Sequence, residues 1–92
     1  MRNWLTVSVG DQRSGGLIDP SILQVDQFNA VRINQTTIGQ RLVLPEPTIP
    51  AVGKMFAVIN VGTQAFQLLE ALVEPRTTLL LFWDGTAWSR VI

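Results

Sequence analysis

The dipeptide Asp84-Gly85, close to the end of the chain, is the feature that most restricts the fold. The central residues of a type I′ turn need positive φ, which Gly adopts freely and Asp tolerates, so the pair is a strong hairpin signal. A run of β-forming residues, 79–83, comes before it, and residues 87–92 can form the returning strand. A hairpin of this size is not stable alone in water, so the rest of the chain must cover both of its faces.

The length of the loop sets which residues of this hairpin face each other. With a two-residue loop, Trp83 is predicted to lie opposite Thr86, and Leu81 opposite Trp88. The two tryptophans are then diagonal neighbours on one face of the hairpin, within reach of each other because their rings are large.

The rest of the chain contains several short segments that alternate or are rich in β-forming residues. Residues 64–73 also carry apolar residues at helical spacing, but the run is short and turns flank it, which favours a strand. Turn signals recur about every 8–12 residues, and no internal repeat is evident. We therefore expect an all-β fold, a small antiparallel β-sandwich or barrel. The strands predicted before the hairpin are 4–9, 28–33, 42–44, 54–60 and 65–69.

The beginning of the chain differs in character from the remainder. Residues 10–21 contain three glycines, one proline and three charged residues, which is typical of a loop rather than a core element. We expect an extended N-terminal arm that can embrace a neighbouring subunit. The chain is thus predicted to be one domain, with a strand and arm over residues 1–27 and a β-sandwich or barrel core over residues 28–92.

The composition favours self-association. The chain has 92 residues, of which 47% are hydrophobic and only 15% are charged, against about 25% charged in an average soluble domain. A domain of this size buries only about 60–65% of its unfolded surface, so the excess of apolar residues favours an oligomer interface. The net charge is zero and no basic run occurs, which argues against nucleic acid or an anionic membrane as the partner.

Targeting and redox signals are also lacking. The N-terminal residues lack the apolar stretch of a signal peptide, and no segment approaches the roughly 18 apolar residues of a membrane helix. The absence of cysteine excludes disulfides and zinc sites built on thiolates. We therefore expect a soluble product made in the cytoplasm, without a membrane partner.

The chain lacks the residues of most catalytic sites. It has no histidine, cysteine or tyrosine, so the usual general base near neutral pH is missing. Lys54, the only lysine, could in principle pair with a serine, and two of the seven carboxylates could act together, but no local motif supports either alternative. We expect no enzyme activity, no catalytic residue, no metal site and no cofactor.

The large apolar residues in exposed contexts are the best candidates for binding. Trp83 and Trp88 could stack on a sugar, but packing in a core or an interface is the more common use of such residues. Trp4 lies apart from them in sequence and is expected to anchor an interface. The residues predicted to form an interface are Trp4, Leu17, Ile18, Phe28, Trp83 and Trp88.

Three segments of the second half resemble a module found in virion proteins of tailed bacteriophages. In that pattern a strand ends in Leu-Pro-x-Pro, a strand of the type Gly-Lys-x-Phe-x-Val-x-Asn-x-Gly follows, and a later strand runs into Trp-Asp-Gly-Thr-x-Trp. The matching segments are Leu44-Pro45-Glu46-Pro47, residues 53–62 and Trp83-Asp84-Gly85-Thr86-Ala87-Trp88. The resemblance covers residues 42–92, somewhat over half of the chain.

The resemblance implies a structural role. Modules of this kind are small β-structures that often form trimers in tail fibres, head fibres and capsid decoration proteins. Because the chain begins with its own Met1 and ends on the hairpin, we expect a freestanding capsid decoration (cement) protein at the capsid surface. It would bind the major capsid protein as a homotrimer. The alternative is a module of a tail or head fibre, or a receptor-binding module that binds carbohydrate through Trp83 and Trp88.

Overall fold

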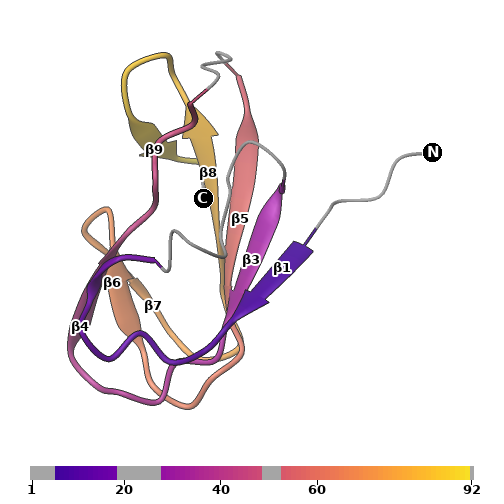
Figure 1. Ribbon diagram of the computed structural model, residues 1–92. Helices are drawn as coiled ribbons and strands as arrows, with labels where there is room; N and C mark the ends of the chain where they lie inside the picture. Colours follow the sequence, from indigo (N-terminus) through magenta and orange to yellow (C-terminus); the bar gives the residue numbers. More distant parts are fainter. Residues whose placement is uncertain (1–5, 19–27, 49–52, 92) are drawn as a thin grey trace.

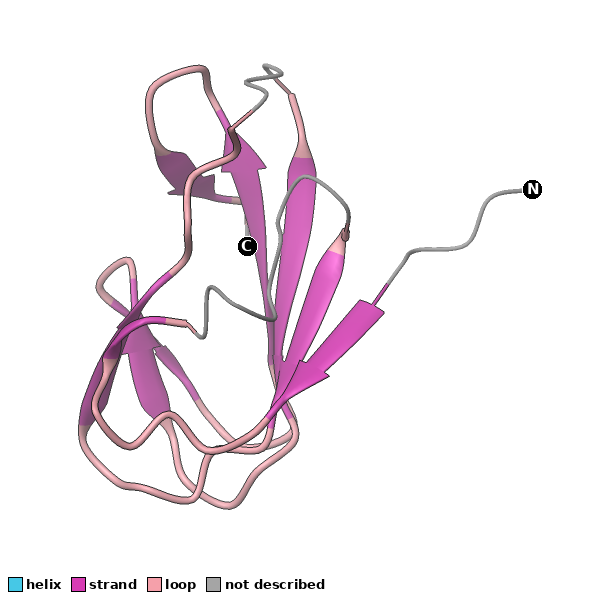
Figure 2. Cartoon of the chain, viewed as in Figure 1, coloured by secondary structure: helices cyan, strands magenta, loops and turns pink. Residues whose placement is uncertain are grey.

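The computed structural model describes residues 6–18, 28–48 and 53–91 of the chain. These residues form nine strands and no helix (Figures 1 and 2). In chain order the strands are β1 (Thr6–Val9), β2 (Gly16–Leu17), β3 (Ala30–Ile33), β4 (Gln40–Val43), β5 (Met55–Asn60), β6 (Phe66–Leu68), β7 (Ala71–Val73), β8 (Thr78–Trp83) and β9 (Trp88–Arg90).

The strands form two sheets that face each other across the core (Figure 1). The larger sheet has the order β1-β3-β5-β8-β9 and the smaller sheet the order β2-β4-β6-β7. The first six strands alternate between the two sheets and run parallel within each of them. They therefore wind as three flattened coils of a solenoid, which the antiparallel strands β7, β8 and β9 complete.

Equivalent positions of the three coils lie side by side in the larger sheet. Val31 pairs with Val7 on one side and with Val58 on the other. Both Val31 and Val58 are fully buried, and Val7 packs at the edge of the same core. The sequence hides this structural repeat because the loops between the strands differ in composition from coil to coil.

The all-β prediction and the two-layer arrangement are confirmed, but the strand pairing is mixed rather than antiparallel. Parallel neighbours need a crossover connection of about a dozen residues or more. Here each crossover contains a strand of the opposite sheet. The short, regularly spaced strands predicted from the sequence are therefore compatible with parallel as well as with antiparallel pairing. The expected antiparallel pairs occur only among β5, β8 and β9 and between β6 and β7.

The core lies between the inner faces of the two sheets. Strand β5 shows the alternation that the sequence predicts, with Phe56 and Val58 buried and the residues between them half-buried. The largest side chains that are fully buried there are Phe56, Phe66, Ile18, Ile33, Leu42, Leu68 and Leu81.

The closing hairpin is confirmed, but its loop is longer than expected. Trp83 pairs directly with Trp88, so the loop contains four residues rather than two. The Asp84 carboxylate accepts hydrogen bonds from the backbone N–H groups of Thr86 (2.8 Å) and Ala87 (2.9 Å). Within the loop only Gly85 has positive φ. Asp84 thus closes the turn through its side chain. Its own backbone does not need the left-handed conformation that a type I′ turn would require.

A second hairpin was missed by the sequence analysis. The segment predicted as strand 65–69 is indeed a strand, β6, but it turns at once into β7. The two turn residues, Leu69 and Glu70, have φ of 51° and 62°. Non-glycine residues other than Asn and Asp rarely adopt this conformation, so neither residue signals a turn in the sequence.

The described part of the predicted arm belongs to the sandwich. Strand β2 pairs with β4, and the N–H of Ile18 donates to the carbonyl of Val43 at 3.0 Å. Ile18 is fully buried in the core. Residues 10–15 form the predicted loop, but the expectation that this segment contributes no core element is wrong for residues 16–18, because Ile18 packs into the core and Leu17 pairs in the smaller sheet. Residues 19–27 of the predicted arm lie outside the described residues.

Candidate interaction surface

The outer face of the smaller sheet carries exposed apolar side chains. In β4 the side chain of Leu42 is buried, whereas Val43 is 50% exposed on the opposite side of the strand. Leu17 of β2, the direct neighbour of Val43, is 53% exposed. Leu72 of β7 is 59% exposed and pairs with Gln67 of β6. We call this surface the outer face, and it consists of Leu17, Arg41, Val43, Gln67 and Leu72.

Two further apolar side chains flank the outer face. Ile38 precedes β4 and is 75% exposed, and Leu69 follows β6 in the turn of the hairpin. Among the described residues seven large hydrophobic side chains are exposed, and five of them lie on or beside this sheet. Such clustering on one side of a small domain is typical of a surface that another protein covers.

The electrostatics of the outer face also fit a protein contact. Arg41 is its one charged residue, and it pairs in register with Gln67 of β6. In the part of the chain that the structure describes, Arg41 has no ion-pair partner within 4 Å. Interfaces are enriched in arginine and depleted of other charged residues, because guanidinium groups combine an apolar stem with several donors.

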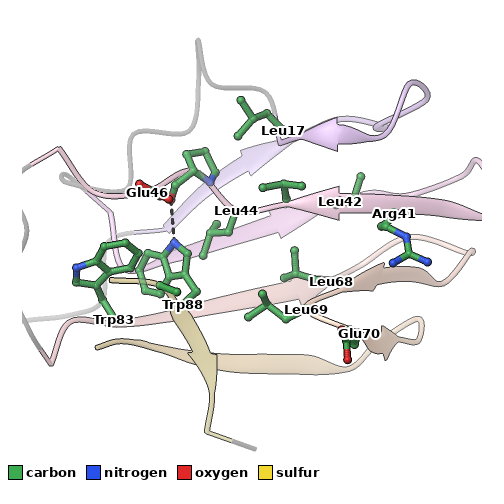
Figure 3. A pocket seen from close by; sticks show the side chains of 13 residues that line it. Leu17, Arg41, Leu42, Leu44, Glu46, Leu68, Leu69, Glu70, Trp83 and Trp88 are labelled. Atoms are coloured by element: carbon green, nitrogen blue, oxygen red, sulfur yellow. Dashed lines mark hydrogen bonds between the residues drawn. The ribbon is translucent and has the colours of Figure 1, made fainter. Parts of the chain in front are cut away.

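An apolar groove lies beside the tryptophan pair and extends along the smaller sheet (Figure 3). Its volume is about 680 Å³. Trp83 and Trp88 lie at one end of it and Arg41 and Glu70 at the other (Figure 3). The leucines between the two ends are Leu42, Leu44 and Leu68, with Leu17 and Leu69 at the sides.

The tryptophan pair is part of the core rather than a binding platform. Trp83 is 4% exposed and Trp88 7%. Their ring centroids are 5.3 Å apart and the rings meet edge to face at 67°. A sugar would need an accessible ring face, and neither ring offers one. This geometry argues against the carbohydrate platform considered from the sequence, since the observed register makes the two rings cover each other.

The two indole N–H groups have different environments. The N–H of Trp88 donates to the carbonyl of Pro45 at 2.9 Å and so ties the hairpin to the segment that follows β4. Among the residues that the structure describes, the buried indole N–H of Trp83 has no hydrogen-bond partner. A buried donor without a partner carries a desolvation cost, so the two tryptophans stabilise the fold unequally.

Among the described residues, those predicted to form an interface do not form a common surface. Leu17 is exposed on the outer face, and Phe28 is partly buried against the core. Ile18, Trp83 and Trp88 fill the core of a single chain, and we correct their assignment to an interface on that ground. Trp4 lies outside the described residues, so its role stays a prediction.

Most of the outer face was not predicted from the sequence. Val43 lies in a predicted strand but was not identified as pointing outward, and Leu72 lies outside the predicted strands because β7 was not predicted. The adjacent apolar residues Leu42 and Val43 do carry a signal in the sequence. Side chains alternate along a strand, so one of the two must point away from the core. The exposed Leu69 offered no comparable signal, since its turn is not encoded by turn residues.

The acidic side chains examined for chemistry have structural roles. Hydrogen bonds from the Thr37 hydroxyl and the Thr36 and Thr37 N–H groups lower the pKa of Asp11 to about 2. The N–H groups of Ala87 and Thr86 likewise lower the pKa of Asp84. A carboxylate whose pKa is lowered is a weaker base, so both groups suit turn formation better than proton transfer.

Residues 6–18, 28–48 and 53–91 contain no cluster of three acidic side chains that could hold a metal ion. They also contain no helix long and apolar enough to cross a membrane. No protein-family model, no curated protein and no solved structure matches the chain.

Proposed function

We propose that the chain is a structural protein of a tailed-bacteriophage virion, which decorates the capsid by binding the major capsid protein through the outer face. The observation that carries this proposal is the clustering of exposed apolar side chains over the smaller sheet. The resemblance of residues 42–92 to phage virion modules supplies the class of partner.

The placement of the outer face supports attachment to a broad protein surface. Strands β2, β4, β6 and β7 hold its side chains on hydrogen-bonded ladders, so little conformational entropy is lost when the surface is covered. The alternation of the strands keeps Leu17, Val43 and Leu72 on the side opposite to the core. A partner can therefore cover this surface without disturbing the packing between the sheets.

The role is mechanical and involves no turnover. A stable contact of about 1,200–2,000 Å² would hold each copy on the shell. Symmetric copies that bridge neighbouring capsid subunits would resist the outward pressure of the packaged genome, and their attachment would be strengthened by avidity.

Co-sedimentation with capsid shells tests this proposal. Shells assembled from the major capsid protein of the same phage would be mixed with the purified chain and pelleted. We expect the chain to saturate the shells at a fixed ratio to the capsid subunit and to raise the temperature at which they disassemble. Failure to pellet with the shells would contradict the proposal, and glycan binding without shell binding would favour the receptor-binding alternative.

A further inference from the structure

The four edge strands of the two sheets differ in how well they are protected from pairing with another chain. Strand β7 lies between Glu70 and the pair Glu74-Pro75, and β9 ends on Arg90. Strand β2 has only two residues. Charges, proline and short length are the usual features that prevent an edge strand from recruiting a partner. Three of the edges are therefore protected.

Strand β1 lacks each of these features. Its four residues, Thr6-Val7-Ser8-Val9, are β-forming or small, uncharged and free of proline and glycine. Its one neighbour in the larger sheet is β3, so the opposite side of β1 is an open edge among the described strands (Figure 1). Thr6 and Ser8 are exposed there.

The backbone groups that face the open edge can be identified from the ladder with β3. The carbonyl of Val9 accepts a hydrogen bond from the N–H of Asn34 at 3.3 Å, so the backbone groups of Val9 point toward β3. The direction alternates along a strand, and Val7 points the same way. The N–H and C=O groups of Thr6 and Ser8 consequently point to the open side.

We propose that two copies of the chain, rather than the three that the resemblance implies, form a two-fold dimer in which their β1 strands pair antiparallel along this open edge. A two-fold axis at Val7 places Thr6 of one copy opposite Ser8 of the other, and each such pair can exchange two hydrogen bonds. Val7 then lies opposite Val7 of the second copy, and the valines of both copies stay on the core side of one continuous sheet.

Self-pairing is favoured because nothing in β1 repels a second β1. The strand has no charge, so like charges do not face each other across the dimer axis. The nearest exposed charge, Arg32 of β3, would be separated from its symmetry mate by three strand spacings, roughly 14 Å. That distance exceeds the Debye length of about 8 Å at physiological salt, so the repulsion is largely screened.

Sedimentation velocity of the purified chain over a wide concentration series tests the dimer, with Ser8→Pro as the decisive variant. Proline removes the Ser8 N–H, which has no role in the β1–β3 ladder, so the single chain tolerates it. We expect the dissociation constant to rise roughly 10–100-fold, because each dimer loses two hydrogen bonds. Ser8→Ala keeps the N–H and should dimerise like the natural chain, whereas Ser8→Lys should weaken the dimer by charge repulsion.

Amide hydrogen exchange gives a second readout that needs no variant. The amides of Thr6 and Ser8 should become protected as protein concentration rises, while that of Val7 should be protected at all concentrations by its bond to β3. A chain that stays monomeric, a trimer, or a dimer that Ser8→Pro and Ser8→Lys leave intact would overturn the proposal. These measurements need no capsid shell, so their outcome is separate from that of the proposed function.

Discussion

The loop end of the molecule and the outer face of the smaller sheet are held by opposite kinds of interaction. The loop end consists of residues 10–15, 34–39 and 61–65, which connect the coils at the lower end in Figure 1. It buries polar side chains and satisfies them with hydrogen bonds. The outer face exposes apolar side chains and leaves them uncovered. The first region therefore serves the fold, and the second is available for a partner.

Two fully buried polar residues show how this end of the molecule is held. Gln35 lies within the loop end, and Asn60, the last residue of β5, lies directly before it. The Gln35 side chain accepts from the N–H of Gln12 at 3.1 Å and donates to the carbonyl of Thr37 at 2.9 Å. Asn60 donates to the carbonyls of Gln64 (2.8 Å) and Val73 (3.0 Å). The bond between Gln12 and Gln35 joins the loops of the first two coils. The Gln35 carbonyl accepts from the N–H groups of Thr63 and Gln64 and so joins the second loop to the third. These two contacts fix a register that parallel strands alone would leave less well defined.

Gly62→Ala should have the largest effect, because it breaks the loop end at its closest backbone contact. An added Cβ would lie 2.1 Å from the carbonyl oxygen and 2.2 Å from the nitrogen of Gln35. Because both are backbone atoms, the coil must move, and we expect a loss of about 3 kcal/mol or more in the free energy of unfolding. Gly10→Ala is the matched control, since no atom lies within 4 Å of its added Cβ. Urea unfolding of both variants measures the difference.

Asn60→Ala should follow in size. It leaves the N–H of Gly62 and the carbonyls of Gln64 and Val73 without their side-chain partner. Each buried group left unsatisfied costs about 1–3 kcal/mol, and some relaxation is expected, so we predict a total near 3 kcal/mol. Gln67→Ala on the outer face should cost less than about 0.5 kcal/mol. Equal losses for the two variants would contradict the contrast between the regions.

Replacing Trp83 or Trp88 by phenylalanine compares a hydrogen-bonded with an unbonded indole inside the core. Both changes remove a similar volume, but Trp88→Phe also frees the carbonyl of Pro45, whereas Trp83→Phe removes a donor that has no partner. We therefore expect Trp88→Phe to be more destabilising, by about 1 kcal/mol. Thermal unfolding followed by the fluorescence of the two remaining tryptophans measures this difference, and the opposite ranking would show that packing outweighs hydrogen bonding here.

The smallest effect concerns the dependence of stability on pH. The folded-state pKa of Asp11, about 2, lies below its ordinary value of 3.8. Its contribution to stability is thus fully present above pH 3.8 and is lost as pH falls toward 2. Asp11→Asn should be less stable than the natural chain at neutral pH and should lose less stability between pH 4 and about pH 2. Parallel unfolding curves for the two chains across that range would contradict the role of Asp11.

The sequence predicted the strands better than their partners. Alternation identified β5, and the Asp84-Gly85 turn signal identified the closing hairpin. Neither signal could reveal the parallel pairing, since a crossover strand in the other sheet leaves no local signal. The four-residue loop was also hidden, because the Asp84 side chain replaces a backbone conformation that Asp-Gly usually signals.

The candidate site was less predictable than the fold. Large apolar residues were expected at an interface, yet Trp83 and Trp88 are buried while Leu72 is exposed. Hydrophobicity is the same signal in a core and in an interface, so residue type cannot separate them. The direction of each side chain decides the matter, and that direction depends on which residue begins each strand.

The double variant Val43→Lys with Leu72→Lys tests the separation of fold and function most directly. Both side chains are at least half exposed, so two measurements are made on the variant, its free energy of unfolding in urea and its co-sedimentation with capsid shells. We predict a change in unfolding free energy below about 1 kcal/mol, within the range of surface strand substitutions, together with loss of shell binding. Undiminished shell binding by the folded variant would contradict the assignment of the outer face.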